Sequence, residues 1–206
     1  GQERTATVMA ALRDYLVFDF ETTGLDPATE RIIQVGVARV ANGEIAEHQG
    51  WLVDQDHPVD PDAQRIHGIS REKTREGLKP EISLLRLLAM MQAAPVCIGH
   101  NIHRFDVPFL RSECDRLGLA MPEWEGYVDT AAHYKGRRLR MTQQADENEY
   151  EYALRVLSRR VPGLRYSIDE CLKELGIRFD RGSVHDAAAD ASATHHIYQA
   201  LFTDKG

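Results

Sequence analysis

Cysteine is scarce in this sequence, and long apolar runs are missing from it. The three cysteines, Cys97, Cys114 and Cys171, form no CxxC pair and are an odd number. Each lies in an apolar-rich stretch and is predicted to be a buried thiol, which favours a reducing compartment, the cytoplasm. No stretch approaches the roughly 18 apolar residues of a membrane span, and we find no signal peptide. We therefore expect no association with a membrane.

An excess of positive charge is also missing. The 206 residues include 25 Lys and Arg against 32 Asp and Glu, which gives a formal net charge of -7. Proteins that bind long duplex nucleic acid usually present a basic surface, so charge alone does not favour that partner. A group of metal-binding carboxylates would contribute to the negative balance. The length and the 43% hydrophobic content suit one globular domain with a sizeable core.

The distribution of apolar residues predicts an α/β fold in which an antiparallel hairpin stands at one side of the sheet. Residues 1–13 are polar and predict a frayed tail or a short leading helix, and 14–206 form one domain without repeats or linkers. Asn42-Gly43 is a strong hairpin signal, and Ser70 is suited to cap a short helix. Strands are predicted over 14–20, 31–40, 44–53 and 95–99, and helices over 80–92, 107–117, 128–134, 167–175 and 186–201.

One stretch, from about 135 to 165, alternates in charge. Lys135–Arg140 is basic, Asp146–Glu151 is acidic, and Arg155–Arg165 is basic again. One interpretation is a solvated helical insertion whose charges pair with each other. The alternative is a mobile flap whose arginines touch the phosphates of a substrate.

Two carboxylates, Asp19 and Glu21, stand one residue apart at the end of the apolar run 16–20. Side chains alternate across a strand, so both carboxylates point to the same face. Two anionic groups at the edge of a core repel each other and are costly to bury without a positive partner. A hard divalent cation with oxygen ligands satisfies this demand, so the pair predicts a metal-dependent enzyme.

Three further residues are candidates for the same site. Asp106 starts a predicted helix near the end of a strand, where α/β sheets bind ligands, although a plain capping role is equally open. Asp190 lies on the alanine-rich side of the last helix, and the alternative is an exposed helix charge. His185 precedes that helix; a lone histidine is more often a surface residue, but its closeness to Asp190 favours catalysis.

Taken in order, these segments resemble the three motifs of the DEDDh 3′–5′ exonucleases, the DnaQ-like family of the ribonuclease-H-like superfamily. The matching segments are Asp19-x-Glu21 with Thr22-Thr23-Gly24, Gly99-His100-Asn101 with Phe105-Asp106, and His185-x4-Asp190. Arg65–Ile69 resembles an ancillary segment of the same family. The resemblance spans about residues 14–202 and implies a mixed five-stranded sheet flanked by helices.

The resemblance implies a two-metal reaction. Asp19, Glu21 and Asp190 would hold one Mg²⁺ or Mn²⁺, and Asp19 would bridge to a second ion supported by Asp106. Two such ions roughly 3.5–4 Å apart stabilise the attacking and leaving oxygens of an in-line displacement. His185 would act as the general base, and the product would be a nucleoside 5′-monophosphate.

The resemblance also implies a pocket for the terminal nucleotide. The backbone at Phe20 and Thr22, beside Gly24, and the side chain of Thr23 would hold the 3′-hydroxyl. Leu25 and Ile69 would wedge against the last bases, although core packing is equally open for Leu25. The remaining pocket residues would be His67, Asn101 and Phe105, the last with the same alternative of core packing.

The expected partner is the 3′ end of a single-stranded nucleic acid. We predict DNA as the substrate, with RNA ends or short oligoribonucleotides as the first alternative, because sugar discrimination depends on groups around the 2′ position. An inactive module that binds nucleic acid or a partner is the minor alternative. Many members of this family form dimers, but nothing in the sequence marks a homodimer interface or identifies a protein partner.

Overall fold

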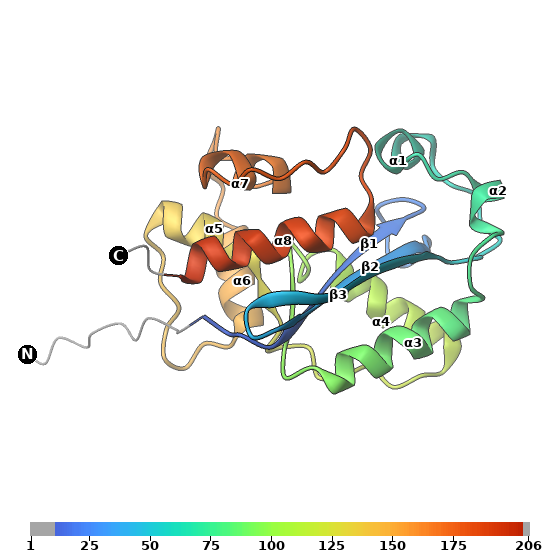
Figure 1. The fold of residues 1–206 in the computed structure, drawn as a ribbon, viewed down its shortest axis with the longest axis horizontal. Helices are drawn as coiled ribbons and strands as arrows, with labels where there is room; N and C mark the ends of the chain where they lie inside the picture. Colours follow the sequence, from blue (N-terminus) through green and yellow to red (C-terminus); the bar gives the residue numbers. More distant parts are fainter. Residues whose placement is uncertain (1–10, 204–206) are drawn as a thin grey trace, which may run out of the picture.

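The computed structural model describes residues 11–203, and the remaining terminal residues appear only as a thin trace in Figure 1. Most of the tail expected over residues 1–13 therefore lies outside the described residues. Residues 11–13 precede the first strand without forming a helix or a strand. Within the described range, the helices are too short or too polar to cross a lipid bilayer.

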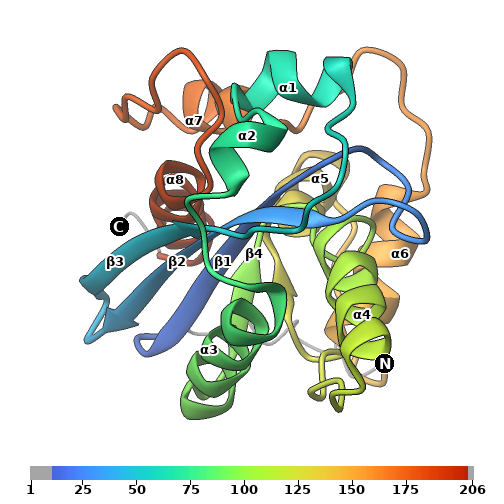
Figure 2. The same cartoon turned by 90° about the vertical axis from the view of Figure 1, so that its right-hand side faces the viewer.

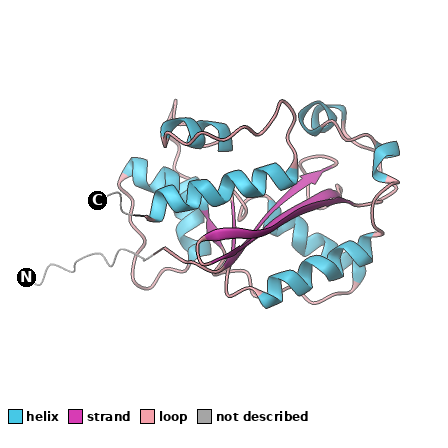
Figure 3. Cartoon of the chain, in the orientation of Figure 1, coloured by secondary structure: helices cyan, strands magenta, loops and turns pink. Residues whose placement is uncertain are grey.

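A mixed five-stranded sheet forms the centre of the molecule (Figure 3). β1 (Tyr15–Thr22), β2 (Ile32–Ala41) and β3 (Glu44–Leu52) pair as an antiparallel meander, and β4 (Cys97–Gly99) and β5 (Val128–Asp129) continue from β1 in parallel. The spatial order is β3-β2-β1-β4-β5. The prediction of a mixed five-stranded sheet with a hairpin at one side is confirmed.

Helices cover both faces of this sheet. In Figure 2, α8 lies on one face, while α3 and α4 lie on the other. α1 and α2 lie near the carboxyl end of β1, and α5 and α6 lie beyond β4 (Figures 1 and 2). The described helices are α1 (Pro61–His67), α2 (Arg71–Thr74), α3 (Pro80–Ala93), α4 (Asp106–Leu117), α5 (Thr130–Leu139), α6 (Glu149–Leu157), α7 (Ile168–Glu174) and α8 (Ala187–Phe202).

The alternation of side chains along β1 divides the core in two. Phe18 and Phe20 pack into the larger cluster, with residues of α3 and α4. Tyr15 and Val17 belong to a second cluster, which includes residues of α8. Residues two apart share a face of a strand, so Asp19 and Glu21 lie on the same face as Tyr15 and Val17, the face that α8 covers. The alternation along β1 therefore places these two carboxylates on the side of the sheet where α8 packs.

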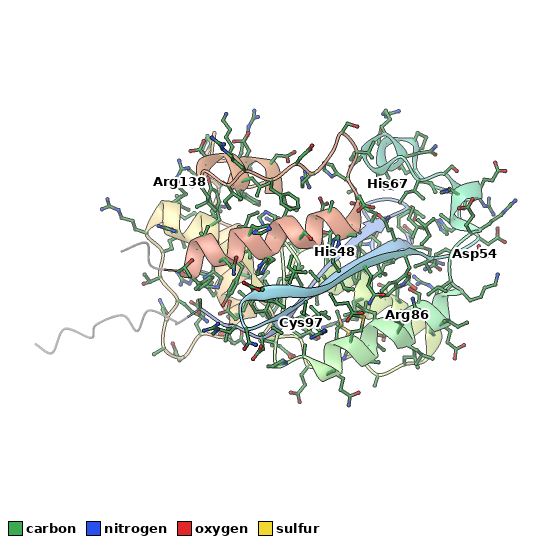
Figure 4. All side chains as sticks on the ribbon, viewed as in Figure 1. His48, Asp54, His67, Arg86, Cys97 and Arg138 are labelled. Carbon is green, nitrogen blue, oxygen red and sulfur yellow. The ribbon has the colours of Figure 1, made fainter. Side chains whose placement is uncertain are left out.

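α8 begins in direct contact with the sheet because two strands carry glycine there. A Cβ atom at Gly36 of β2 would overlap the backbone carbonyl of Ala187, and one at Gly50 of β3 would lie 3.1 Å from Cβ of Ala188. His48 of β3, labelled in Figure 4, contacts the carbonyl oxygen of Ala188 through Nε2 at 2.6 Å. Gly36 pairs with Asp19 in the β1–β2 register, so this close approach occurs beside the first carboxylate.

Two segments differ from the sequence-based expectations. The helix predicted over 128–134 begins with the two residues of β5, which pair with Ile98 and Gly99 before α5 starts. Two strand residues are too few to produce an alternating pattern, so the sequence could not distinguish them from the helix. No helix is predicted over 61–67, yet Pro61 starts α1 there and the Asp60 side chain accepts a hydrogen bond from the amide of Asp62.

The charged 135–165 segment is mostly packed structure. α6 buries Tyr152 and Val156 in a cluster shared with α5. Arg155 pairs with Glu147 at 2.6 Å, which agrees with the interpretation of self-pairing charges. Lys135 differs from both interpretations, because it is buried and donates to backbone carbonyls of the 157–159 turn.

The contact between α8 and β2 predicts that Gly36→Ala destabilises the fold by about 3 kcal/mol, because the added methyl group overlaps backbone rather than a side chain that can turn away. Urea denaturation followed by circular dichroism would measure the free energy of unfolding. Gly126→Ala is the matched control, since a Cβ there meets no atom within 4 Å. Equal stabilities of the two variants would contradict the proposed role of Gly36.

Candidate active site

Three of the predicted catalytic residues meet at the carboxyl end of β1. Glu21, His185 and Asp190 each offer one ligand atom, and these atoms lie within 4.8 Å of one another. Glu21 comes from β1, Asp190 from the first turn of α8, and His185 from the loop before α8. Glu21 and Asp190 are nearly buried, whereas His185 is exposed to solvent. The structure therefore joins the first and third sequence motifs.

Asp106 reaches the same strand from the other side. It is the first residue of α4 and only 2% exposed, and its Oδ2 accepts a hydrogen bond of 3.1 Å from the amide of Phe20. That amide belongs to the residue between Asp19 and Glu21. The hydrogen bond fixes the second motif against the first, so the four predicted carboxylates belong to one electrostatic cluster.

The protonation of this cluster reflects its crowding. Burial, followed by the charges of Asp190 and Asp106, raises the pKa of Asp19 well above its ordinary value. The same causes raise the pKa of Glu21 to about 9. Burial also raises the pKa of Asp106 and of Asp190, against hydrogen bonds that favour the ionised carboxylates. Without an added cation, the cluster therefore resists carrying four negative charges.

The donor set fits a divalent metal ion. Among the described residues, Oδ2 of Asp19 is buried and has no hydrogen-bond partner. Such an orphaned carboxylate oxygen is costly unless a cation completes it. The other groups are carboxylates and one imidazole, and oxygen-rich sets of this kind suit Mg²⁺ and Mn²⁺.

Arg181 is a site residue that the sequence analysis missed. Its side chain, 7% exposed, forms an ion pair with Asp190 and a two-pronged pair with Asp169 of α7, at 3.0 Å for each prong. One of its terminal nitrogens also lies 3.4 Å from Nε2 of His185. Arg181 is not part of any recognised motif, and only the fold brings its loop over the cluster.

A second missed group fixes the start of α8. The side-chain amide of Gln34 donates to Asp186 at 3.0 Å and accepts from the amide of Ala187 at 3.0 Å. Asp186 also caps the helix through the amide of Ala189. Gln34 pairs with Glu21 in the β1–β2 register, so these hydrogen bonds fix the start of α8, and with it Asp190, beside the end of β1.

His67, the last residue of α1, connects that helix to β1. Its Nε2 lies 3.0 Å from the carbonyl oxygen of Thr22, and its Nδ1 accepts from the amide of Ile69 at 3.0 Å. These partners require a neutral ring with the proton on Nε2, and burial lowers the pKa of His67. Both ring nitrogens are occupied, so His67, labelled in Figure 4, ties α1 to the end of β1.

The loop after β1 is held by its own side chains. Thr23 is buried, and its hydroxyl donates to Glu30 at 2.5 Å and accepts from the amide of Arg31 at 2.8 Å. Gly24 leaves room for Glu30, because a Cβ there would lie 2.9 Å from that side chain. These bonds do not support the predicted contact of the Thr23 side chain with a 3′-hydroxyl. Leu25, by contrast, is 84% exposed and open to a ligand.

Of the other predicted pocket residues, Asn101 and Phe105 lie in the loop between β4 and α4, and Ile69 lies between α1 and α2. Asn101 has a positive φ of 60°, and its buried Oδ1 has no partner among the described residues. The backbone amide of Asn101 donates to Oδ1 of Asp129 at 2.8 Å. Asp129 is the buried N-cap residue of α5, and the sequence analysis missed it as well. Phe105 packs against Phe109 with a centroid distance of 4.9 Å, and Ile69 is only 7% exposed.

Fold and carboxylate cluster together define the class of the protein. The sequence model of the exonuclease family matches residues 16–198, so the chain belongs to that family. It is an exonuclease domain of the DnaQ-like DEDDh type, as the motifs predict.

Among curated proteins, the chain is 28% identical over 186 residues to the PolC-type DNA polymerase III of Thermotoga petrophila, which covers 89% of this chain and 11% of the polymerase. It is 32% identical over 107 residues to the PolC-type enzyme of Streptococcus agalactiae serotype III, which covers 52% of this chain and 7% of that enzyme. The chain thus spans about a tenth or less of the length of these relatives.

Solved structures confirm the ribonuclease-H-like fold. E. coli exonuclease I in complex with a dT13 oligonucleotide superimposes with a TM-score of 0.72 at 22% identity, covering 93% of this chain and 41% of that one. The zinc-bound form of the same enzyme with single-stranded DNA gives a TM-score of 0.70 at 21% identity, covering 94% and 40% of the two chains.

The raised pKa of Glu21 predicts a pH-dependent stability in the presence of chelator. Glu21 titrates near its ordinary pKa of 4.5 when unfolded but at about 9 when folded. Between these values the folded protein binds the extra proton, so the free energy of unfolding falls as pH rises. We expect Glu21→Gln to remove part of this fall, as measured by urea denaturation at several pH values.

The exposed Glu123 provides the matched control for that experiment. Glu123→Gln should leave the pH dependence of wild type intact. A Glu21→Gln variant with the full wild-type slope would show that burial does not hold a proton on this carboxylate.

Proposed function

We propose that this domain is a metal-dependent 3′–5′ exonuclease that releases nucleoside 5′-monophosphates from single-stranded DNA. The observation that carries the proposal is the convergence of Glu21, Asp190 and His185 within 4.8 Å, beside the orphaned carboxylate oxygen of Asp19. The single-stranded DNA in the E. coli exonuclease I complexes supports this choice of substrate.

Asp19, Glu21 and Asp190 would hold Mg²⁺ or Mn²⁺, with Asp106 completing a second position. When bound, such ions lower the pKa of water and stabilise the charge that develops on the phosphate oxygens. The protein contributes the fixed carboxylates, which α8 and the β1 register hold close together before a substrate arrives. Preorganised charge of this kind reduces the reorganisation needed during reaction.

His185 is suited to accept the proton of the attacking water. Its imidazole is exposed, so it can reach a substrate at the mouth of the cluster, and its ligand atom lies within 4.8 Å of those of Glu21 and Asp190. Its backbone amide donates to the carbonyl of Ile66 in α1 at 3.0 Å, which anchors the loop. An ordinary imidazole titrates near neutral pH and can both take and return a proton.

The terminal nucleotide would lie between the β1 loop and α1. Leu25 offers an exposed apolar side chain for base stacking, and Ile69, which is 7% exposed, would form the second apolar contact. Asn101 and Phe105 would close the other side of this pocket. Recognition of one or two terminal nucleotides needs few phosphate contacts, which agrees with the net charge of -7.

A cytoplasmic location is part of this proposal. The three cysteines are free and buried, as a reducing compartment favours. A homodimer and the identity of any protein partner stay predictions.

The decisive experiment is a gel time course of 5′-labelled single-stranded DNA, RNA and duplex DNA with Mg²⁺, Mn²⁺ or EDTA. We expect a metal-dependent ladder that shortens from the 3′ end of DNA, and its absence with Asp19→Ala, since that variant loses the carboxylate with the orphaned oxygen. Faster digestion of RNA would assign the alternative exoribonuclease. No shortening of any substrate would favour a binding module without activity.

Replacement of the proposed base separates proton transfer from metal binding. We expect His185→Ala to slow cleavage by about 10²–10⁴-fold while its Mn²⁺ affinity stays near that of wild type. Single-turnover cleavage and calorimetric titration would measure the two quantities. His196→Ala, which alters another histidine near the middle of α8, serves as the control. Loss of Mn²⁺ binding in His185→Ala would identify His185 as a ligand instead of a base.

A further inference from the structure

A guanidinium group already occupies part of the carboxylate cluster. Arg181 forms an ion pair with Asp190, the same residue whose other neighbours are Glu21 and His185. The side chains of Arg181 and Asp190 are 7% and 6% exposed, so little water screens this pair. A positive charge therefore lies where a metal ion would need the oxygens of Asp190.

Asp169 fixes the position of that charge. The Arg181 guanidinium spans the Asp169 carboxylate with Nε and one terminal nitrogen, each at 3.0 Å, in the geometry typical of strong arginine pairs. Asp169 lies on α7 and its side chain is 69% exposed, so it is separate from the buried cluster. Arg181 can give up Asp190 and still keep a charged partner.

The electrostatics agree with a counter-ion role. Arg181 lowers the pKa of Asp19, of Glu21 and of Asp190, against the burial that raises each of them. Burial lowers the pKa of Arg181, but its hydrogen bonds and charge pairs with Asp169 and Asp190 outweigh burial and raise it. The guanidinium thus stays charged and cannot leave the cluster by losing its proton. It has to move away from Asp190 or be outcompeted there.

We propose that Arg181 is the resident counter-ion of the catalytic carboxylates and competes with the divalent metal for Asp190. In the metal-free protein it offsets the repulsion among the carboxylates. Metal binding requires that it release Asp190 and retain Asp169, so the residue sets the metal concentration at which the site fills. This inference rests on the proposed metal-dependent function and assigns a role to a residue outside the family motifs.

Calorimetric titration of Mn²⁺ into the wild type and Arg181→Gln tests the competition directly. We expect Arg181→Gln to bind Mn²⁺ about tenfold more tightly, a typical coupling between two linked ligands. Its melting temperature in EDTA should fall below that of the wild type, and Mn²⁺ should raise it by more. A purely structural role would lower the melting temperature with and without metal and leave the affinity unchanged or weaker.

Two variants sharpen the test. Arg181→Lys keeps the charge and should bind Mn²⁺ nearly as the wild type does. Arg178→Gln removes an exposed arginine from the same loop and should change neither the affinity nor the melting temperature. Tightening in Arg181→Lys equal to that in Arg181→Gln would overturn competition by charge.

The outcomes also separate this inference from the proposed function. If the wild type binds Mn²⁺ but Arg181→Gln binds it no more tightly, the counter-ion role is wrong and the metal-dependent function stands. If only Arg181→Gln binds Mn²⁺ at the concentrations tested, competition is supported in its strongest form. If neither binds Mn²⁺, both the counter-ion role and the metal-dependent function are overturned.

Discussion

Repulsion among the carboxylates at the end of β1 is the constraint around which this domain is arranged. Burial and mutual charge raise the pKa of Asp19, of Glu21 and of Asp106, so the folded chain holds these groups together at a cost in stability. A chain selected only for stability would keep these carboxylates apart, whereas an active site of this kind needs them close together. The surrounding contacts are consequently those that keep the carboxylates close in spite of this repulsion.

Those contacts come from three directions. Glycine in β2 and β3 lets the first turn of α8 lie directly on the sheet, and the Gln34 amide fixes the helix at that height. The Phe20 amide binds Asp106 from α4, and His67 connects α1 to the end of β1. Most of these contacts involve backbone atoms, and among the described residues Oδ2 of Asp19 stays without a hydrogen-bond partner.

Sequence reasoning located the residues whose spacing is local. Asp19 and Glu21 follow from strand alternation, Asp190 from the alanine-rich face of its helix, and the hairpin from Asn42-Gly43. It missed β5, because two residues carry no periodicity, and it missed α1, which has only 7 residues. It also missed Arg181, whose partners on α7 and α8 become neighbours only through tertiary structure, and the hydrogen bonds that occupy Thr23.

The order in which the chain is synthesised determines when the carboxylate cluster can form. The cluster combines β1, near the start of the described chain, with α8, at its end. On the ribosome, residues 11–180 can emerge and begin to pair while Asp190 is still inside the exit tunnel. A growing polypeptide of this kind lacks both His185 and Asp190, so under the proposed function it would have no cleavage activity until α8 has docked on the sheet.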